Sequence, residues 1–143
     1  MPLSEFEMIS RYFRHLSPER ADTILAIGDD AALLEVPAGH RLLTTLLQWQ
    51  KDIDYPASEA AHITAQRFLQ QAIAAIEVLG TEPKWMTLSL SFDHLDAAWL
   101  EDFCTGLSQL MLQHNIQLIG GDSTQGPETL RIFLMGTEAS SGR

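Results

Sequence analysis

The segment at residues 85–92 places the tightest constraint on the fold, because its side chains alternate between apolar and polar. The apolar members share one face and short polar residues separate them: Met86, Leu88, Leu90 and Phe92 against Thr87, Ser89 and Ser91. This period of two is typical of a strand with one buried face. Helical patterns flank it, one over residues 57–79 ended by Gly80, the other capped by Asp96. The sequence therefore predicts a sheet with helices packed against one face.

The rest of the chain adds strands around this unit. Further strands are predicted by apolar runs, and an amphipathic pattern predicts an N-terminal helix: strands at 24–27, 31–36, 41–49, 116–119 and 130–134, and the helix at 4–13. The turn at 37–40 is expected to join its two neighbouring strands as a hairpin. This order predicts an α+β domain with a mixed, mainly antiparallel sheet. Residues 1–136 form that single domain, and 137–143 are expected to be a flexible tail.

Charge and cysteine content exclude several functional classes. The 143-residue chain has 9 Lys+Arg against 19 Asp+Glu, a formal net charge of −10, and one cysteine. The excess of acid argues against nucleic acid and membrane partners, because phosphate neutralisation needs clustered Lys and Arg. The N-terminus lacks a signal-peptide pattern, and the lone Cys104 is expected to be a small buried hydrophobe. We therefore expect a cytoplasmic domain.

Two segments, each expected to be a loop after a short strand, combine glycine with aspartate. They read Gly-Asp-Asp at 28–30 and Gly-Gly-Asp at 120–122. Glycines let backbone N–H groups approach a phosphate, and carboxylates are the ligands that Mg²⁺ prefers. If the loops converge, Asp29, Asp30 and Asp122 would hold Mg²⁺, and Gly120 and Gly121 would contact a phosphate. The alternative is that both segments are ordinary turns, since neither matches the P-loop or the dinucleotide fingerprint.

Several segments together resemble the thiamine-monophosphate kinase family, which is related to aminoimidazole ribonucleotide synthetase. The segments that carry the resemblance are Ile27-Gly28-Asp29-Asp30-Ala31-Ala32-Leu33-Leu34, Pro83-Lys84-Trp85-Met86-Thr87-Leu88, Ala98-Trp99-Leu100 and Gln117-Leu118-Ile119-Gly120-Gly121-Asp122-Ser123-Thr124-Gln125-Gly126-Pro127, with Glu5-Phe6 and Arg11-Tyr12-Phe13 near the N-terminus. The resemblance covers essentially the whole chain. It implies an amino-terminal domain that dimerises through a β-barrel, ATP and Mg²⁺ as cofactors, and a second domain, which we expect to be absent here.

The chain departs from the family at the metal motifs. The family's Ser-Thr-Asp-Thr motif corresponds to residues 45–48, so Leu47, or Leu46 if the register slips by one, replaces a metal-binding Asp, and Thr45 is left as a candidate ligand. The family's Asn-Leu-Ser-Asp corresponds to residues 72–75, where Ala75 replaces a second metal-binding Asp. A family histidine falls at Asp54, and a family arginine is replaced by Gln125. The replaced positions either pack in the core or form an apolar docking surface.

These losses favour a stand-alone, catalytically incompetent relative of the kinase's amino-terminal domain that acts as a dimeric interaction module. Two alternatives stay open. One is an ATP-dependent thiamine-monophosphate kinase, or a fragment or split half of one, that forms thiamine diphosphate. The other is a weak sensor of Mg-nucleotide or phosphate. A homodimer is expected because the strands at 42–49 and 85–92 offer more apolar surface than the helices can cover, and a separate second-domain protein is a further candidate partner.

Overall fold

The computed structural model describes residues 12–13, 16–26 and 31–140 of the chain. Its main sheet has four strands in the order β3-β6-β4-β5. The bounds are His40–Gln50 for β3, Pro83–Phe92 for β4, Gln117–Gln125 for β5 and Thr129–Ala139 for β6. β6 pairs antiparallel with both β3 and β4, whereas β4 and β5 pair in parallel. The predicted mixed, mainly antiparallel α+β fold is confirmed.

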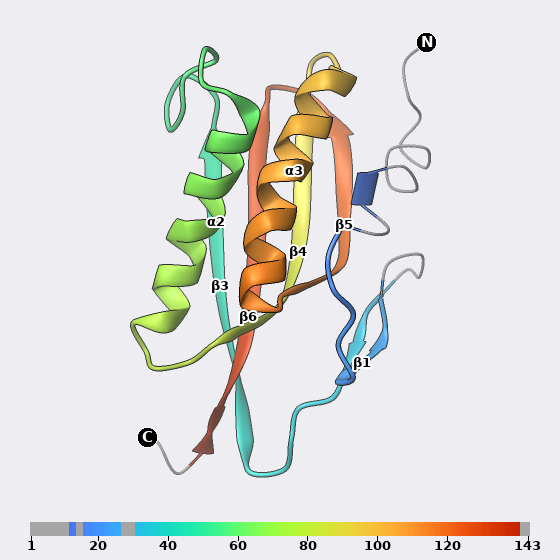
Figure 1. Cartoon of the computed structure of the whole chain (residues 1–143), viewed down its shortest axis with the longest axis vertical. Coiled ribbons are helices and arrows are strands. Elements are labelled where there is room, and N and C mark those ends of the chain that lie inside the picture. Colours follow the sequence, from blue (N-terminus) through green and yellow to red (C-terminus); the bar gives the residue numbers. More distant parts are fainter. Residues whose placement is uncertain (1–11, 14–15, 27–30, 141–143) are drawn as a thin grey trace.

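Two helices cover one face of this sheet, α2 over Ala61–Glu77 and α3 over Ala97–His114 (Figure 1). Asp96 caps α3 as predicted, because its Oδ1 accepts from the backbone N–H of Ala98 at 2.9 Å. α2 begins later than predicted and is followed by Gly80, whose φ of +79° suits a residue without a side chain. No helix among the described residues is long and apolar enough to cross a membrane.

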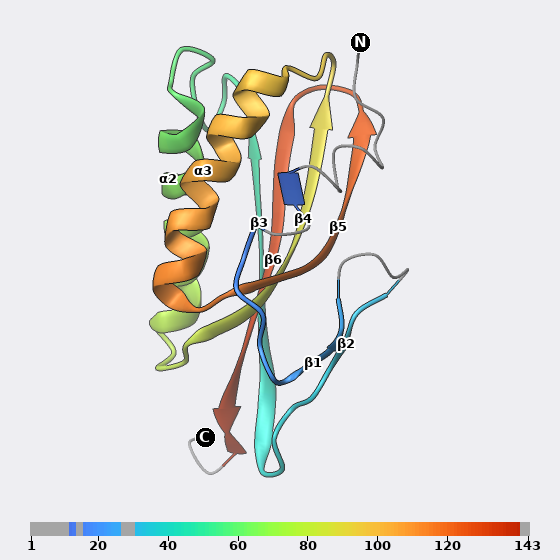
Figure 2. The same ribbon diagram turned by 45° about the vertical axis from the view of Figure 1, so that its right-hand side comes forward.

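The core lies between the helices and the sheet face toward them. The alternating side chains of β4 enter it as predicted, with Met86, Leu88 and Leu90 at most 4% exposed. From the helices, Phe68 on α2 and Phe103 on α3 are fully buried. One face of the sheet is therefore closed, and the opposite face, which we call the open face, has neither α2 nor α3 against it (Figure 2).

The predicted hairpin between residues 31–36 and 41–49 is wrong. The strand β2, Leu33–Leu34, pairs instead with β1, Thr23–Leu25, and the two form a separate small sheet. β3 pairs along its full length with β6, from His40 opposite Ala139 to Gln50 opposite Thr129. A ladder of two eleven-residue strands offers far more pairing than the two residues of β2, so the distant partner replaces the sequence neighbour.

Two further boundaries differ from the prediction. Residues 120–125 are not a loop, because β5 continues through them beside β4 as far as Gln125. The tail predicted from residue 137 begins later, since β6 runs to Ala139 and Thr137 pairs with Leu42. The long partner strand β3 draws these small polar residues into the sheet. Apart from Tyr12 and Phe13, the helix predicted at residues 4–13 lies outside the described residues.

Candidate functional site

The glycine–aspartate segment lies on β5, an edge strand that pairs only with β4 in the described part of the chain. Its register is Gly120 opposite Thr87, Gly121 opposite Leu88 and Asp122 opposite Ser89. The Asp122 side chain is exposed, and its Oδ1 accepts from the backbone N–H of Ser123 at 2.8 Å. The sheet edge thus carries an exposed carboxylate whose second oxygen has no hydrogen-bond donor among the described residues.

The two glycines of this segment have different structural roles. A Cβ on Gly121 would collide with the backbone carbonyl of Leu88 on the neighbouring strand, whereas a Cβ on Gly120 would meet nothing within 4 Å. Neither glycine has a positive φ. Close approach of the backbones of β4 and β5 therefore explains Gly121, and only Gly120 is left without a structural reason to lack a side chain.

The candidate metal ligands do not assemble among the described residues. Thr45 lies on β3, at the opposite edge of the sheet from Asp122, with β6 and β4 between them. Three strand spacings separate the two by roughly 14 Å. By alternation, Thr45 shares the helix-covered side with Leu43 and Leu47, which pack on the core. The described residues contain no group of three or more His, Cys, Asp or Glu placed to hold a metal ion. Asp29 and Asp30 lie outside the described residues.

The positions that correspond to the kinase family's metal motifs divide between core and surface. Leu47 packs against the core, and Ala72 is buried. Leu46 is 55% exposed on the open face, and Ala75 is exposed on α2. Core packing therefore accounts for Leu47 and Ala72, whereas Leu46 belongs to an apolar surface. None of these side chains can coordinate a cation.

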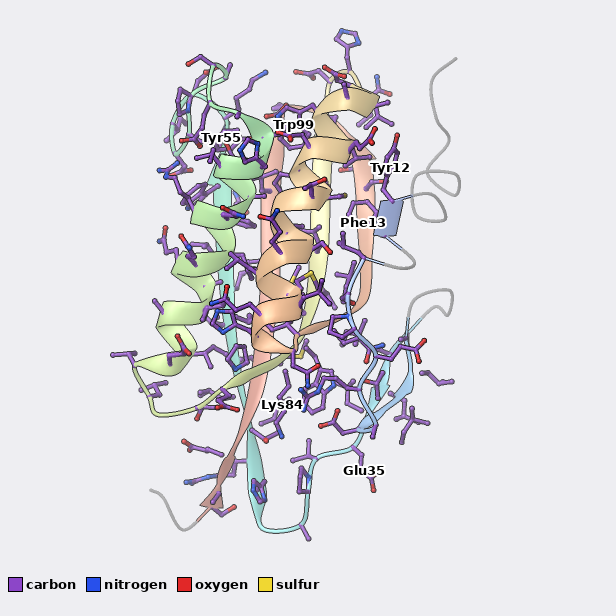
Figure 3. The ribbon with its side chains drawn as sticks, in the orientation of Figure 1. Tyr12, Phe13, Glu35, Tyr55, Lys84 and Trp99 are labelled. Carbon is purple, nitrogen blue, oxygen red and sulfur yellow. The ribbon has the colours of Figure 1, made fainter. Side chains whose placement is uncertain are left out.

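The loop after β3, where the family's histidine falls at Asp54, is fixed by its own contacts. Asp54 Oδ2 accepts from the backbone N–H of Gln50 at 2.7 Å. The buried Tyr55, labelled in Figure 3, donates from its hydroxyl to Glu128 Oε2 at 2.6 Å and stacks on Trp49. Burial and the nearby Glu128 carboxylate both raise the pKa of Tyr55, so its hydroxyl stays protonated. The contacts of Asp54 and Tyr55 therefore hold the loop at the end of β3, and neither side chain is left without a hydrogen-bond partner.

The open face carries an apolar patch on β3 and β6. Leu42, Leu46 and Phe133 are 47%, 55% and 48% exposed, and Leu46 lies directly opposite Phe133 in the ladder. The next row crosses all four strands and is polar: Gln48, Arg131, Ser89 and Asp122. Arg131 Nε donates to Gln48 Oε1 at 2.9 Å, so this arginine is already engaged within the sheet.

The apolar surface differs from the one expected from sequence. The strand at 85–92 was expected to contribute, but all of its apolar side chains are buried: Met86, Leu88, Leu90 and Phe92 in the core beneath the helices, and Trp85 outside that core, against Thr23 and Arg20. β6 contributes instead, through Phe133, which the sequence reasoning missed. The signal was present, because residues 132–135 read Ile-Phe-Leu-Met without a polar residue, and such a run is apolar on both faces of a strand.

A shallow groove of about 380 Å³ runs beside α3, lined by residues that include Tyr12, Leu16, Cys104 and Leu112. Cys104 is buried at its floor, which confirms the expected small buried hydrophobe. Burial raises the pKa of its thiol to about 12, so the reactive thiolate is suppressed at neutral pH. Cys104 is therefore not a reactive nucleophile in this groove.

Comparison with known proteins agrees with this architecture. Residues 28–137 match the family described as AIR synthase related protein, N-terminal domain. Thiamine-monophosphate kinase from Escherichia coli K12 is 37% identical over 142 residues, which cover 95% of this chain and 42% of that protein. The crystal structure of thiamine-monophosphate kinase from Stenotrophomonas maltophilia K279a superposes with a TM-score of 0.83 at 37% identity, over 97% of this chain and 44% of that one.

A more distant structure shares the fold. AaThiL complexed with AMPPCP and TMP superposes with a TM-score of 0.68 at 22% identity, over 80% of this chain and 37% of its own. The chain thus spans less than half the length of these relatives. The matched residues include β2 to β6 and both helices. The chain therefore belongs to the family of AIR synthase related protein N-terminal domains, as a thiamine-monophosphate kinase-like member.

Proposed function

We propose that this chain acts as a dimeric interaction module in which two copies pack through their open faces. The observation that carries the proposal is the exposed apolar patch of Leu42, Leu46 and Phe133 on a sheet whose other face is fully covered. Apolar residues gathered on one face of a soluble domain mark an interaction surface, because leaving them in water forfeits the free energy of burial.

Charge favours the open face over other surfaces as the contact between copies. Two chains of net charge −10 repel each other, so they associate best through surface poor in carboxylates, and the carboxylate in the polar row of the open face, Asp122, lies on the edge strand β5 away from the patch. The patch has no charged member, and the neighbouring cation, Arg131, is held by Gln48. In an interface of the obligate type, two such faces would bury on the order of 2,000 Å² or more.

Oligomeric state tests this proposal directly. Sedimentation equilibrium of the wild-type chain at micromolar concentration should give the mass of a dimer, twice the 15.9 kDa of one chain. A monomer at micromolar concentration would refute the proposal.

We further propose that the chain alone transfers no phosphoryl group. Phosphoryl transfer depends on metal ions that neutralise charge on the transferred group, and Leu47 and Ala75 cannot hold such ions. The chain incubated with ATP, Mg²⁺ and thiamine phosphate should form no thiamine diphosphate above a control without protein. Product that disappears in an Asp122→Ala variant would show the opposite.

The second candidate is that the chain supplies the amino-terminal half of a working thiamine-monophosphate kinase. The 37% identity to the Escherichia coli and Stenotrophomonas maltophilia kinases over nearly the whole chain favours it. ATP and Mg²⁺ would then be the cofactors, and Asp29, Asp30 and Asp122 would be the carboxylates available to the metal. Thr45 does not join them, because it lies at the far edge of the sheet. The described residues thus fit the metal only in part.

Binding of Mg-ATP separates these candidates and also tests the sensor alternative. With Asp122 exposed at a sheet edge, little of the described surface encloses a nucleotide there, and ligand sites normally bury most of the ligand. We expect a Kd no better than about 1 mM, equivalent to roughly 4 kcal/mol. Calorimetric titration of the wild type and of an Asp30→Asn/Asp122→Asn variant measures it. Micromolar binding that the variant loses would favour the sensor or kinase over the module.

A further inference from the structure

The groove beside α3, which we call the α3 groove, lies between two parts of the chain that are far apart in the sequence. One wall is α3, and the other is the segment before β1, which contributes Tyr12 and Leu16 (Figure 3). Ser108 Oγ on α3 donates to the carbonyl of Leu16 at 2.9 Å, and Ser17 Oγ accepts from the backbone N–H of Leu118 on β5 at 2.8 Å. These hydrogen bonds fix the second wall against α3 and β5, so the groove is a formed feature of the domain.

The groove is narrow and its floor is apolar. Leu16 and Cys104 are 8% and 6% exposed, and Leu112 lies at the far end of the groove. The lining residues of α3 run from Glu101 to Leu112, a helical rise of about 16 Å. The volume of about 380 Å³ is at the lower end of the range for small-molecule sites, roughly 300 to 1,000 Å³. A slender small molecule with an apolar stem fits this shape, because its stem would cover the floor along the length of the groove.

Hydrogen bonds within the domain decide which polar groups the α3 wall offers to a ligand. Thr105 Oγ1 donates to the carbonyl of Glu101 at 3.0 Å, and the Ser108 hydroxyl donates to the carbonyl of Leu16. A hydroxyl has one proton to donate, so both oxygens can bind a ligand only as acceptors. Glu101, Thr105 and Ser108 are four and three residues apart, which places them in one row along the helix. This row, which starts with a carboxylate, therefore requires a ligand that donates N–H groups.

The charge of the groove selects a cation. Its described lining includes the Glu101 carboxylate and contains no Lys or Arg. Gln109 also belongs to the lining, but its Oε1 accepts from Gln66 of α2 at 2.6 Å, so this side chain is held toward α2. A protonated amine donates N–H groups and accepts none, whereas a phosphate or a carboxylate would be repelled by Glu101. The formal net charge of −10 also attracts cations to the chain at long range.

We infer that the α3 groove binds a linear aliphatic polyamine. One ammonium group would contact the Glu101 carboxylate and another the hydroxyl oxygens of Thr105 and Ser108, while the methylene chain covers Leu16 and Cys104. The helix rises by about 6 Å from Glu101 to Thr105 and by a further 4.5 Å or so to Ser108, so the acceptors recur as nitrogens do along such an amine. A lysine side chain of another protein fits less well, because it carries a single ammonium group. The inference does not rest on the proposed dimer, since the described lining of the groove includes no strand of the sheet.

Calorimetric titration with spermidine at roughly 0.15 M salt, where long-range attraction is largely screened, tests the inference. We expect a Kd on the order of 100 μM for the wild type and an unchanged Kd for Glu77→Gln, which removes an exposed carboxylate at the end of α2. Glu101→Gln should raise the Kd at least about tenfold, because it removes a charge-assisted hydrogen bond. Thr105→Val has a similar shape without the hydroxyl and should raise the Kd about threefold. Octanediol, which has an apolar stem but no charge, should bind far more weakly than spermidine.

Nuclear magnetic resonance of the labelled wild-type chain locates the bound amine. Spermidine should shift the backbone amide signals of Leu16 and of residues 101–112 and leave those of the other acidic surfaces unchanged. If Glu101→Gln and Glu77→Gln bind spermidine equally, or the shifts spread over the whole acidic surface, the attraction is diffuse and the inference fails. A wild type that binds no spermidine at about 1 mM also refutes it. If a trilysine peptide binds in the groove and spermidine does not, the groove docks a basic protein segment, and the polyamine is excluded.

Discussion

Replacing Gly121 with alanine should destabilise the domain by about 2 kcal/mol, within the range for overpacking a well-packed site. The structure explains why the cost is not smaller. The added Cβ would collide with the carbonyl oxygen of Leu88 on the paired strand and crowd its carbonyl carbon, and neither atom belongs to a side chain that could rotate away. β5 would have to move away from β4 along their parallel ladder.

The adjacent Gly120 provides a matched control. Its Cβ would meet nothing within 4 Å and its φ is not positive, so Gly120→Ala should change stability by less than about 0.5 kcal/mol. Urea unfolding at equal protein concentrations measures both variants, with about 2 kcal/mol appearing as a loss of roughly 1 M in the midpoint for a slope near 2 kcal/mol/M. Equal stability of the two variants would refute the close-approach explanation and return Gly121 to the candidate ligand-binding residues.

The remaining predictions concern α3 and the lost metal position. Asp102→Ala should cost about 1 kcal/mol, because Asp102 accepts from the backbone N–H of His62 at 2.9 Å and caps α2, which has no side-chain cap of its own. Hydrogen bonds from the His62 side chain, and then from its backbone N–H, lower the pKa of Asp102 in the folded chain. The extra stability of the wild type over the variant is therefore full at pH 7 and is lost as the pH falls from 3.8 through the lowered pKa. Urea unfolding at several pH values measures this loss. Cys104 should react with a thiol reagent at pH 8 only after unfolding, since burial raises its pKa to about 12, and fast labelling of the folded chain would contradict its burial. Leu47→Asp should not create kinase activity, because Ala75 still replaces the second ligand and single repairs of a cooperative site recover little; thiamine diphosphate formed by this variant would oppose that view.

The sequence predicted correctly those helices and strands whose formation depends mainly on neighbouring residues. The alternation at 85–92, the Asp96 cap and the end of α2 before Gly80 all depend on residues close together in the sequence, and each is confirmed. Strand partners are decided over long distances, and there the local signal failed. The turn at 37–40 suggested a hairpin, but β3 found an equally long partner ninety residues away in β6, as in the pairing of Gln50 with Thr129 and His40 with Ala139.

The candidate site was predicted less completely, for the same reason. Sequence chemistry identified Asp122 as an available carboxylate, and it is exposed at a sheet edge. The same reasoning could not see that Thr45 would lie at the opposite edge, or that Leu46 and Leu47 would point to opposite sides of β3. Phe133 was missed because its exposure depends on which face the helices cover, and that is settled by the packing of α2 and α3.

The central claim is that the open face joins two copies of the chain, and one paired measurement tests it most directly. Sedimentation equilibrium compares Phe133→Asp, which puts a charge in the patch, with Leu112→Asp, at an exposed apolar position on the outer side of α3. The account predicts that Phe133→Asp is a folded monomer, judged by its circular dichroism, and that Leu112→Asp remains a dimer like the wild type. A Phe133→Asp variant that dimerises as tightly as Leu112→Asp would contradict it.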